Sequence, residues 1–408
     1  MKQEPNVSRI SGITRKRIPL VGRILSLVLV AGIHSGFGQT DLQADVPEPA
    51  QVTQSTKTPA AESQPISHSK KKRKSGRRGS FAAAPIPISS PAIGSGVVPV
   101  VGYIFPLSSK DKISPPSVIG AGGLITNNNS RGFAVGGQLY MKEDTYEISS
   151  VYVHGNLDYN IYGTGVVANE KLPLEQTGQG YLGEFLRRVA WKLFVGPRFA
   201  AGSSLITIQP NNVDGFPIPP DLGIHTNLVS IGARATWDTS VNRFYPVGGT
   251  FFSFTSDFFL QSIGSKYSFQ SYKTSFSKYW SLSKKQVLAY NGYFCAVGGA
   301  PPFYGNCIYG TNNELRGYTA GRYFDRYMMA TQAEYRLVLP MRLGVVAFGG
   351  IGGVRAGDSQ LLQSQHFLPA GGVGLRFDLS PKYHVNLRAD IARGTDGHTF
   401  SLGILEAF

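Results

Sequence analysis

The chain has 408 residues and a formal net charge of +15, yet only 16% of its residues are charged, compared with about 25% in soluble domains. Its apolar runs fall short of the ~18 residues of a membrane-spanning helix, so a position within a membrane would require a β-barrel; a soluble all-β protein is the alternative. Two cysteines exclude a disulfide-rich scaffold and a cysteine-based metal site.

The first predicted element is a signal peptide over residues 1–38. Its basic part contains Arg15, Lys16 and Arg17, and an apolar segment follows at 24–33. That segment is too short to span a membrane, and small residues follow it, which is typical of a cleaved export signal. We therefore expect an exported protein; an ordinary hydrophobic N-terminal segment is the alternative.

Residues 39–96 are predicted to form a disordered periplasmic linker, because they are polar and nearly free of aromatic side chains. The linker contains seven closely spaced positive charges, Lys70, Lys71, Lys72, Arg73, Lys74, Arg77 and Arg78. We expect this basic run to bind an anionic envelope surface, and a merely solvated tail is the alternative. Export argues against nucleic acid as a partner, although the isoelectric point is 9.7.

Residues 97–408 are predicted to form short β-strands. In the segments 229–238, 250–260, 373–379 and 385–391, apolar side chains alternate with polar or charged ones at a period of two. One apolar face opposite a charged face is typical of a barrel with lipid outside and water inside. A soluble sandwich, with the apolar face inward, has the same alternation and stays an alternative at this point.

Cys295 and Cys307 lie twelve residues apart across a Gly-Gly-Ala-Pro-Pro loop. In the oxidising envelope, this spacing allows a disulfide that closes an external loop. Two unpaired thiols are the alternative.

The segment 313–336 begins as a glycine-rich loop and ends as an alternating strand. Its motif residues are Leu315, Arg316, Gly317 and Tyr318, then Gly321 and Arg322, then Glu334, Tyr335 and Arg336. This motif resembles the signature of the bacterial surface antigen barrels, the outer-membrane superfamily of BamA-like and TamA-like proteins. Weaker support comes from a Tyr-Gly-x-Gly turn at 162–165 and from Asp238 followed by Pro246, Val247, Gly248 and Gly249.

The resemblance implies an all-β transmembrane antiparallel β-barrel of about 16 strands, with an extracellular loop folded into the lumen. Residues 97–408 number 312, so sixteen strands of ~10 residues would leave ~10 residues for each connection. Typical members carry periplasmic polypeptide-transport-associated domains ahead of the barrel. The linker at 39–96 is too short and too polar for one, so we expect a stand-alone barrel.

The resemblance also implies that Arg316 is the buried tip of the inward loop and pairs with lumen carboxylates. Glu334 matches one family partner. The second partner is usually an aspartate in a Phe-x-Asp-x-Gly strand, and here Gly350 occupies that position. We expect Asp390 to replace it. Arg336 and Arg388 are expected in the same lumen cluster.

The chain ends with Phe400, Leu402, Ile404 and Phe408 at even spacing. A terminal aromatic on an alternating last strand resembles the signal by which outer-membrane barrels are recognised for assembly. We expect these four side chains to form it.

The resemblance implies an integral protein of a Gram-negative-type outer membrane that aids the insertion or translocation of proteins or lipids. Its expected partners are outer-membrane lipids, lipopolysaccharide and nascent outer-membrane proteins. A passive pore or structural barrel is the alternative, and an outer-membrane lipid hydrolase is a third. Because no catalytic or metal-binding motif occurs, we predict no catalytic residue, metal or cofactor.

Overall fold

The computed structural model describes residues 79–90, 93–111, 113–162, 171–208, 223–242, 245–310, 314–355, 367–380 and 385–408. The predicted signal peptide, the basic run of the linker and most of the Tyr-Gly-x-Gly turn lie outside these ranges. No helix within them combines the length and apolar character needed to cross a membrane.

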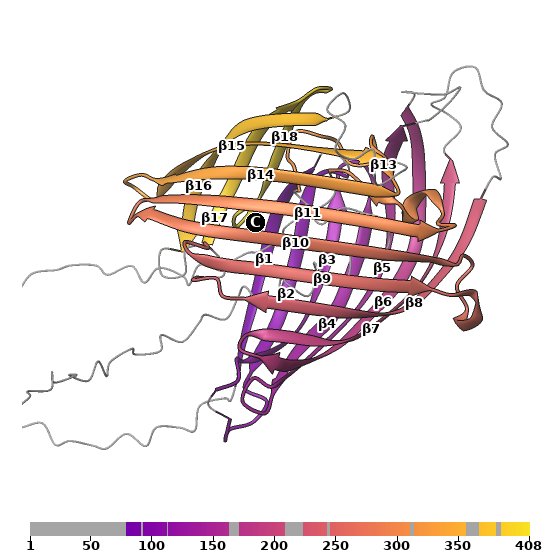
Figure 1. The fold of residues 1–408 in the computed structure, drawn as a ribbon, viewed down its shortest axis with the longest axis horizontal. Coiled ribbons are helices and arrows are strands. Elements are labelled where there is room, and N and C mark those ends of the chain that lie inside the picture. Colours follow the sequence, from indigo (N-terminus) through magenta and orange to yellow (C-terminus); the bar gives the residue numbers. More distant parts are fainter. Residues whose placement is uncertain are drawn as a thin grey trace, which may run out of the picture.

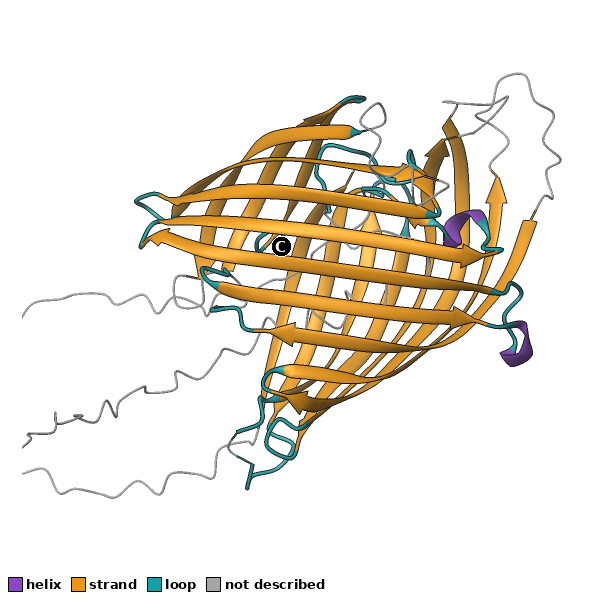
Figure 2. Ribbon diagram, in the orientation of Figure 1, coloured by secondary structure: helices purple, strands orange, loops and turns teal. Residues whose placement is uncertain are grey.

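Sixteen strands of the described residues form one closed antiparallel barrel in which β18 lies beside β1 (Figure 1, Figure 2). The first eight are β1 (Ser80–Ser90), β2 (Gly94–Phe105), β3 (Ser117–Thr126), β4 (Arg131–Met141), β5 (Tyr146–Tyr162), β6 (Lys171–Ala190), β7 (Leu193–Ile208) and β8 (Gly223–Asp238). The others are β9 (Gly249–Phe259), β10 (Phe269–Ser283), β11 (Gln286–Gly299), β14 (Tyr327–Val338), β15 (Leu343–Arg355), β16 (Leu368–Ser380), β17 (Val385–Gly394) and β18 (Gly397–Ile404). Short strands β12 (Cys307–Ile308) and β13 (Phe324–Asp325) pair with each other, and η3 (Gln261–Ile263) and η4 (Phe303–Gly305) are single 3-10 turns. The predicted sixteen-stranded barrel is confirmed.

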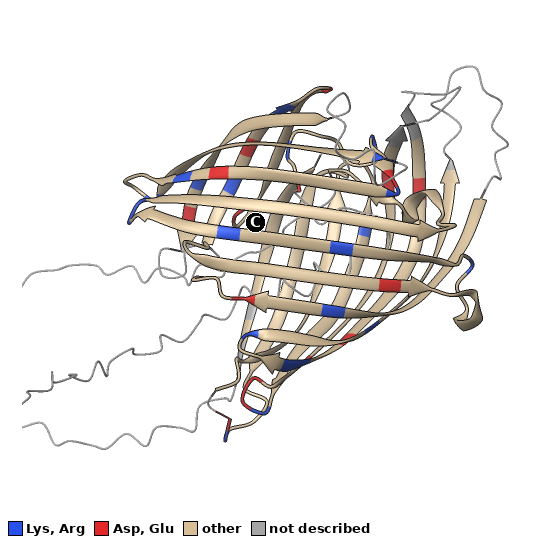
Figure 3. Cartoon of the chain, viewed as in Figure 1, with Lys and Arg blue, Asp and Glu red and all other residues tan. Residues whose placement is uncertain are grey.

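The barrel strands keep the predicted alternation of faces. On β16, Val373 and Leu375 are exposed on the outside, whereas Arg376 is buried and faces the lumen. On β17, Ile391 is exposed and Asp390 is buried. Charged residues occupy isolated positions along the strands (Figure 3). A soluble sandwich would bury the apolar face, so the exposed apolar face favours a barrel surrounded by lipid.

The barrel begins earlier than predicted, because β1 starts at Ser80. The predicted linker is therefore wrong over 80–96, which forms β1 and the start of β2. β1 pairs with β2 along its whole length. Pro85 and Pro87 conceal this strand in the sequence, because proline is excluded from strand interiors and tolerated only at weakly paired edges.

The strands differ in length around the barrel (Figure 1). The far wall, β5 to β8, has strands of 17, 20, 16 and 16 residues, whereas β17 and β18 have 10 and 8. A tilted strand needs about 9–11 residues to cross the hydrocarbon core of a bilayer. The far wall therefore extends beyond the bilayer, and β18 is too short to cross an average one.

β1 and β18 meet at the seam of the barrel. Within the described residues, the seam has a single register pair, Ser89↔Leu402. The ladders on either side are longer, with eleven pairs between β1 and β2 and eight between β17 and β18. The closure of the barrel is therefore weakest where the first and last strands meet.

Apolar packing closes the seam where hydrogen bonds do not. On β1, exposed Phe81 marks the outward face, so the alternating residues Ile86 and Ile88 point inward. On β18, exposed Phe400 marks the outward face, to which Ile404 also belongs. Ile404 is nevertheless only 2% exposed, because it packs in one apolar cluster with Ile86 and Ile88. The end of β18 therefore lies behind β1, and the two walls overlap.

Candidate functional site: the lumen arginine cluster and the seam

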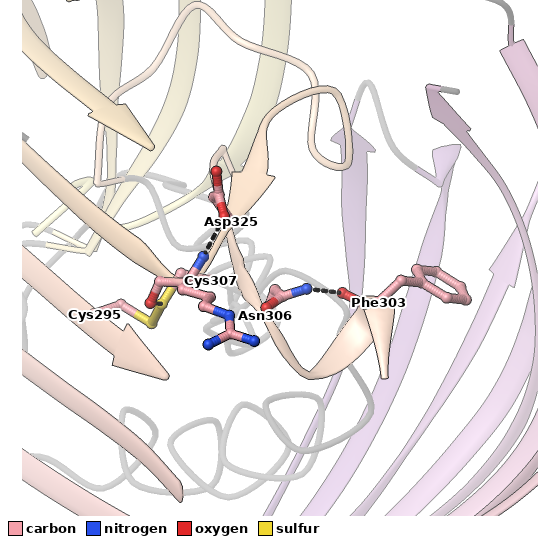
Figure 4. Close-up of a disulfide and its surroundings, with 6 residues drawn as sticks. Cys295, Phe303, Asn306, Cys307 and Asp325 are labelled. Carbon is pink, nitrogen blue, oxygen red and sulfur yellow. Dashed lines mark hydrogen bonds between the residues drawn. A yellow bond between two sulfur atoms is a disulfide. The ribbon is translucent and has the colours of Figure 1, made fainter. Parts of the chain in front are cut away.

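The inward loop, residues 300–326, connects β11 to β14, and its described parts, 300–310 and 314–326, lie within the lumen. A disulfide joins Cys295 on β11 to Cys307 on β12, with 5.9 Å between the Cα atoms (Figure 4). Cys307 also pairs with Asp325 across the two-stranded β12–β13 sheet. At the start of the loop, the Asn306 side-chain amide donates to the Phe303 carbonyl at 3.2 Å (Figure 4). These contacts fix the base of the loop against the barrel wall.

The tip of the inward loop is buried against the last strands of the barrel. Gly317 has φ of +116°, and a Cβ at this position would lie 3.0 Å from the Ala370 Cβ and 3.2 Å from the Gly394 nitrogen. Both the dihedral angle and the close approach require glycine. The next residue, Tyr318, donates its hydroxyl hydrogen to the Pro369 carbonyl at 2.6 Å. Leu315 is buried beside them.

Arg316 pairs with both carboxylates that the sequence analysis assigned to it. Its Nη2 donates to Glu334 Oε2 at 2.5 Å, and its Nη1 donates to Asp390 Oδ2 at 2.9 Å. Its Nη2 also donates to Gln332 Oε1 at 3.2 Å, and the guanidinium lies 3.4 Å from the Phe348 ring centroid. Gln332 and Glu334 lie on β14 and Asp390 lies on β17, so the loop tip crosslinks these two strands.

The structure gives a physical reason for glycine at position 350. A Cβ on Gly350 would lie 2.1 Å from the Thr331 carbonyl oxygen and 2.7 Å from Leu315 Cδ1. An aspartate therefore cannot stand there while the loop tip occupies its present position. Asp390 supplies the second carboxylate from β17 instead.

Further arginines extend the lumen arginine cluster, which comprises Arg316, Arg336, Arg376 and Arg388 with Glu334, Asp390 and Glu406. Arg336 Nε donates to Glu334 Oε1 at 2.6 Å. Arg376 donates through Nη1 to Asp390 Oδ1 at 2.6 Å and through Nε to Glu406 Oε2 at 2.8 Å. Arg388 Nε lies 3.6 Å from Asp390 Oδ2. The sequence analysis missed Arg376 and Glu406, although Arg376 occupies a predicted lumen-facing position.

The predicted assembly signal is corrected at its last residue. β18 ends at Ile404, and Leu405 follows with φ of +67°. The tail, residues 405–408, turns into the lumen, where the Phe408 carbonyl accepts a hydrogen bond from Arg336 Nη2 at 2.9 Å. Phe408 is therefore not in line with Phe400, because the backbone leaves the strand before reaching it. Whether Phe400, Leu402 and Ile404 act in assembly stays a prediction.

The remaining motif residues lie nearer the loop end of the barrel. Gly321 has φ of +84°, which glycine adopts without strain. Arg322 Nε lies 3.1 Å from Asp396 Oδ2, in the turn between β17 and β18, and both side chains are partly exposed. Arg322 is therefore a rim contact and does not join the lumen arginine cluster.

A second buried network lies on the far wall and was not predicted. Arg198 donates to Glu184 Oε1 at 2.6 Å and to Asp257 Oδ1 at 2.8 Å. Arg234 adds an ion pair to Glu184 at 3.0 Å. These residues come from β6, β7, β8 and β9, so only their lumen-facing parity could have indicated them in the sequence.

A cavity of about 60 Å³ lies beside the lumen arginine cluster, at the end of the barrel that has the short turns. Its lining includes Tyr245, Arg336, Arg342, Arg376 and Glu406. Burial, together with the Glu406 carboxylate, raises the pKa of Tyr245 to about 12. In the described part of the chain, no group of three or more His, Cys, Asp or Glu side chains is arranged to hold a metal ion.

Known proteins resemble this chain in sequence profile and in fold. Residues 127–399 match the Omp85 superfamily domain. The structure of BamA from Haemophilus ducreyi lacking POTRA domains 1-3 has a TM-score of 0.55 and 15% identity, over 79% of this chain and 69% of that one. CdiB from Acinetobacter baumannii has a TM-score of 0.52 and 13% identity, over 81% and 60% of the two chains. CdiB from Escherichia coli has a TM-score of 0.53 and 11% identity, over 81% and 62%. The chain thus spans less than two thirds of either CdiB chain. No curated protein matches it.

Proposed function

Because the chain belongs to the Omp85 superfamily, we propose that this integral outer-membrane barrel opens its seam to aid the insertion or passage of proteins or lipids. The single register pair Ser89↔Leu402 is the observation that carries the proposal. This function needs no covalent chemistry, because it consists of separating β1 from β18 and thinning the adjacent bilayer.

Opening at the seam costs less than opening elsewhere in the barrel wall. Each backbone hydrogen bond contributes about 0.5–1.5 kcal/mol net to stability. Separating β17 from β18 would break a ladder of eight register pairs, whereas the seam has one. The short β18 also favours a thinner bilayer beside the seam, because lipids adjust to the length of the spanning wall.

The lumen arginine cluster makes one side of the seam stiff. Arg316 links Glu334 on β14 to Asp390 on β17, and Arg376 on β16 links Asp390 to Glu406 in the tail. These ion pairs join β14, β16, β17 and the tail from inside. We therefore expect β1 and its neighbours to move away while the last strands stay in place.

Two further surfaces, the exposed apolar belt and the basic run, are proposed to bind envelope components. We propose that lipopolysaccharide and phospholipids contact the exposed apolar belt, as for other outer-membrane barrels. We also propose that the basic run at 70–78, in a periplasmic linker, binds anionic envelope surfaces.

Depletion of the protein from cells tests the proposed function. If it aids protein insertion, other outer-membrane barrels should fall in abundance while their transcripts hold steady. If it aids lipid passage, the lipid composition of the outer membrane should change. An outer membrane with unchanged proteins and unchanged lipids would contradict both forms of the proposal.

A further inference from the structure

The β1 edge at the seam lacks hydrogen-bond donors. Pro85 stands directly opposite Pro99, and neither has an N–H, so this pair exchanges no hydrogen bonds between β1 and β2. Positions of the same parity, Pro87 and Ser89, therefore also turn their backbone groups towards β18. Ser89 is indeed the residue that pairs across the seam. A strand added to this edge would find no donor at two successive pairing positions.

The space between the overlapping walls is apolar. Ile86 and Ile88 on the inner face of β1, with Val98 on β2, pack against Val385 and Ile404 on the outer face of β17 and β18. These are aliphatic side chains that offer no polar group. An acyl chain can enter between such surfaces without loss, whereas a peptide backbone would leave unsatisfied polar groups there.

A cation without full compensation lies just behind this apolar space. Arg388 is 3% exposed on the lumen face of β17 and stands opposite Gly403 of β18. Its Nε and Nη1 make no hydrogen bond to any residue that the structure describes. Its ion-pair partner Asp390 already accepts hydrogen bonds from Arg316 and Arg376.

Charge counting leads to the same residue. Within the described residues, the four arginines of the lumen arginine cluster make their ion pairs with three carboxylates, and a fourth carboxylate, Asp378, lines the adjoining cavity. A buried guanidinium without its own carboxylate is costly, and an anionic group that reaches it removes that cost. Gly403 has no side chain to block the way from the β1-facing edge of β18 to Arg388.

We propose that the seam is a binding site for an anionic phospholipid. The acyl chains lie between β1–β2 and β17–β18, and the phosphate reaches Arg388 across Gly403 when the seam opens. The inference rests on the proposed opening of the seam, and it names the cargo class as a lipid with a phosphodiester headgroup. An added β-strand is the occupant that Pro85 and Pro87 disfavour.

Native mass spectrometry of the purified full-length protein tests this site. The probes are phosphatidylglycerol, phosphatidylcholine with the same acyl chains, and inorganic phosphate. We expect the wild-type protein to retain one phosphatidylglycerol in preference to phosphatidylcholine. Equal retention of the two lipids would overturn the proposal without reference to any variant. Displacement of the lipid by millimolar inorganic phosphate would show a free-anion site and would also overturn it.

Two arginine variants on the same strand locate the phosphate. Arg388→Gln should weaken phosphatidylglycerol binding about ten-fold, which corresponds to ~1.4 kcal/mol. Arg393→Gln is the matched control, because Arg393 is exposed on the opposite face of β17 and should bind as the wild type does. Arg388→Lys, which keeps the charge, should retain most of the binding. An unchanged affinity in Arg388→Gln would remove Arg388 from the site.

The strand alternative has its own test. A synthetic alternating peptide with a photo-crosslinker should not label β1 of the wild-type protein, but should label Pro85→Val/Pro87→Val, whose edge regains two donors. Labelling of wild-type β1 would overturn the assignment of the cargo class. Results that reject the lipid site differ from results that reject the opening of the seam. Altered outer-membrane proteins on depletion, without retained phosphatidylglycerol, would leave seam opening standing and reject the lipid site.

Discussion

The seam and the far wall are built from the same alternating sequence, but they are held together differently. β5 and β6 share seventeen register pairs, whereas β1 and β18 share one within the described residues. The far wall presents buried charges to the lumen, and the seam presents an apolar overlap. The comparison shows that the stability of the barrel is unevenly distributed. A wall rich in backbone hydrogen bonds resists opening, and an apolar overlap can exchange its side-chain contacts for lipid.

Each region also has a buried ionic network, and the two networks differ in what they join. Arg198 on β7 joins the adjacent strand β6 to β9, which lies beyond β8. Arg316 joins the inward loop to two strands, and Arg336 adds a contact to the tail. The first network therefore links strands of one continuous, fully paired wall. The second positions segments that strand pairing does not hold.

The largest expected effect comes from removing the loop-tip arginine. Arg316→Ala leaves Glu334 and Asp390 with less compensation in the lumen, and breaking such a buried pair costs about 3–5 kcal/mol. The purified variant should unfold at lower denaturant, and its inward loop should be cleaved faster while the barrel stays closed. Arg322→Ala is the control, because its partly exposed ion pair should be worth less than ~1 kcal/mol. Equal losses in the two variants would contradict the assignment.

Breaking the far-wall network should separate stability from function. Arg198→Ala leaves Glu184 and Asp257 short of a partner, and it should also cost about 3–5 kcal/mol in the free energy of unfolding. Because this network lies away from the seam, the folded variant should restore depleted cells as well as the wild type does. If Arg198→Ala is present at the normal level but does not restore depleted cells, the far wall would also be needed for function.

Removal of the disulfide should loosen the base of the inward loop. Cys295→Ser/Cys307→Ser opens a short closed loop, for which chain entropy predicts a loss of ~3 kcal/mol. We expect greater protease sensitivity within 300–326, with the barrel ladder intact in amide hydrogen exchange. Protection of the loop at the wild-type level would show that Arg316 alone is sufficient to hold it.

Restoring donors to the seam should make it resemble the far wall. Pro85→Val/Pro87→Val adds two N–H groups to the β18-facing edge, worth about 1–3 kcal/mol if both find acceptors. Amide exchange at Ser89 and Leu402 should slow, and activity in depleted cells should fall. Pro99→Val, on the opposite side of the β1–β2 ladder, is the control and should leave the seam unchanged.

The smallest effect is expected at a turn remote from both regions. Hydrogen bonds from the Ser114 hydroxyl and from the backbone N–H groups of Ser114, Glu143 and Ile113 hold the pKa of Asp111 well below its usual range. A lowered carboxyl pKa gives stability that is present above about pH 4 and is lost as the pH falls through the folded-state pKa. Because Asp111 is partly exposed, solvent screening should keep the effect below ~1 kcal/mol. Asp111→Asn should remove this pH dependence from the proteolysis of the turn.

Much of the loop tip could be predicted because its chemistry is local. Arg316, Gly317 and Tyr318 provide a cation, a turn residue and an aromatic ring within three consecutive positions. The alternation of side chains along β17 also predicts that Asp390 faces the lumen, where it is buried. Gly350 stands where the family pattern has an aspartate. The structure gives the reason, because a side chain at this position would collide with Leu315 of the loop tip.

Strand β1, the far-wall network and the path of the tail could not be predicted, because each depends on contacts between segments that are distant in the sequence. β1 was hidden because Pro85 and Pro87 break the usual strand pattern, and only a one-sided edge permits them there. The far-wall network joins Glu184 to Asp257 across more than seventy positions, and no short spacing indicates it. The even spacing of Phe400, Ile404 and Phe408 predicts a strand through the last residue, but Glu406 interrupts the apolar alternation and the turn at Leu405 directs the tail to Arg336.

A reversible crosslink across the seam asks whether the barrel must open there to act. Ser89 and Leu402 are register partners across the seam. Because Cα atoms of antiparallel partners lie about 4.5–5.5 Å apart, within the range that a disulfide bridges, Ser89→Cys/Leu402→Cys should lock the seam. Ser150→Cys/Gly183→Cys on the far wall is the matched control, and wild-type protein under reductant controls for the native disulfide. If the seam must open, the oxidised seam variant fails to restore depleted cells, reduction recovers its activity, and the far-wall variant works in both states. Full restoration by the oxidised seam variant would show that the protein acts without opening its seam.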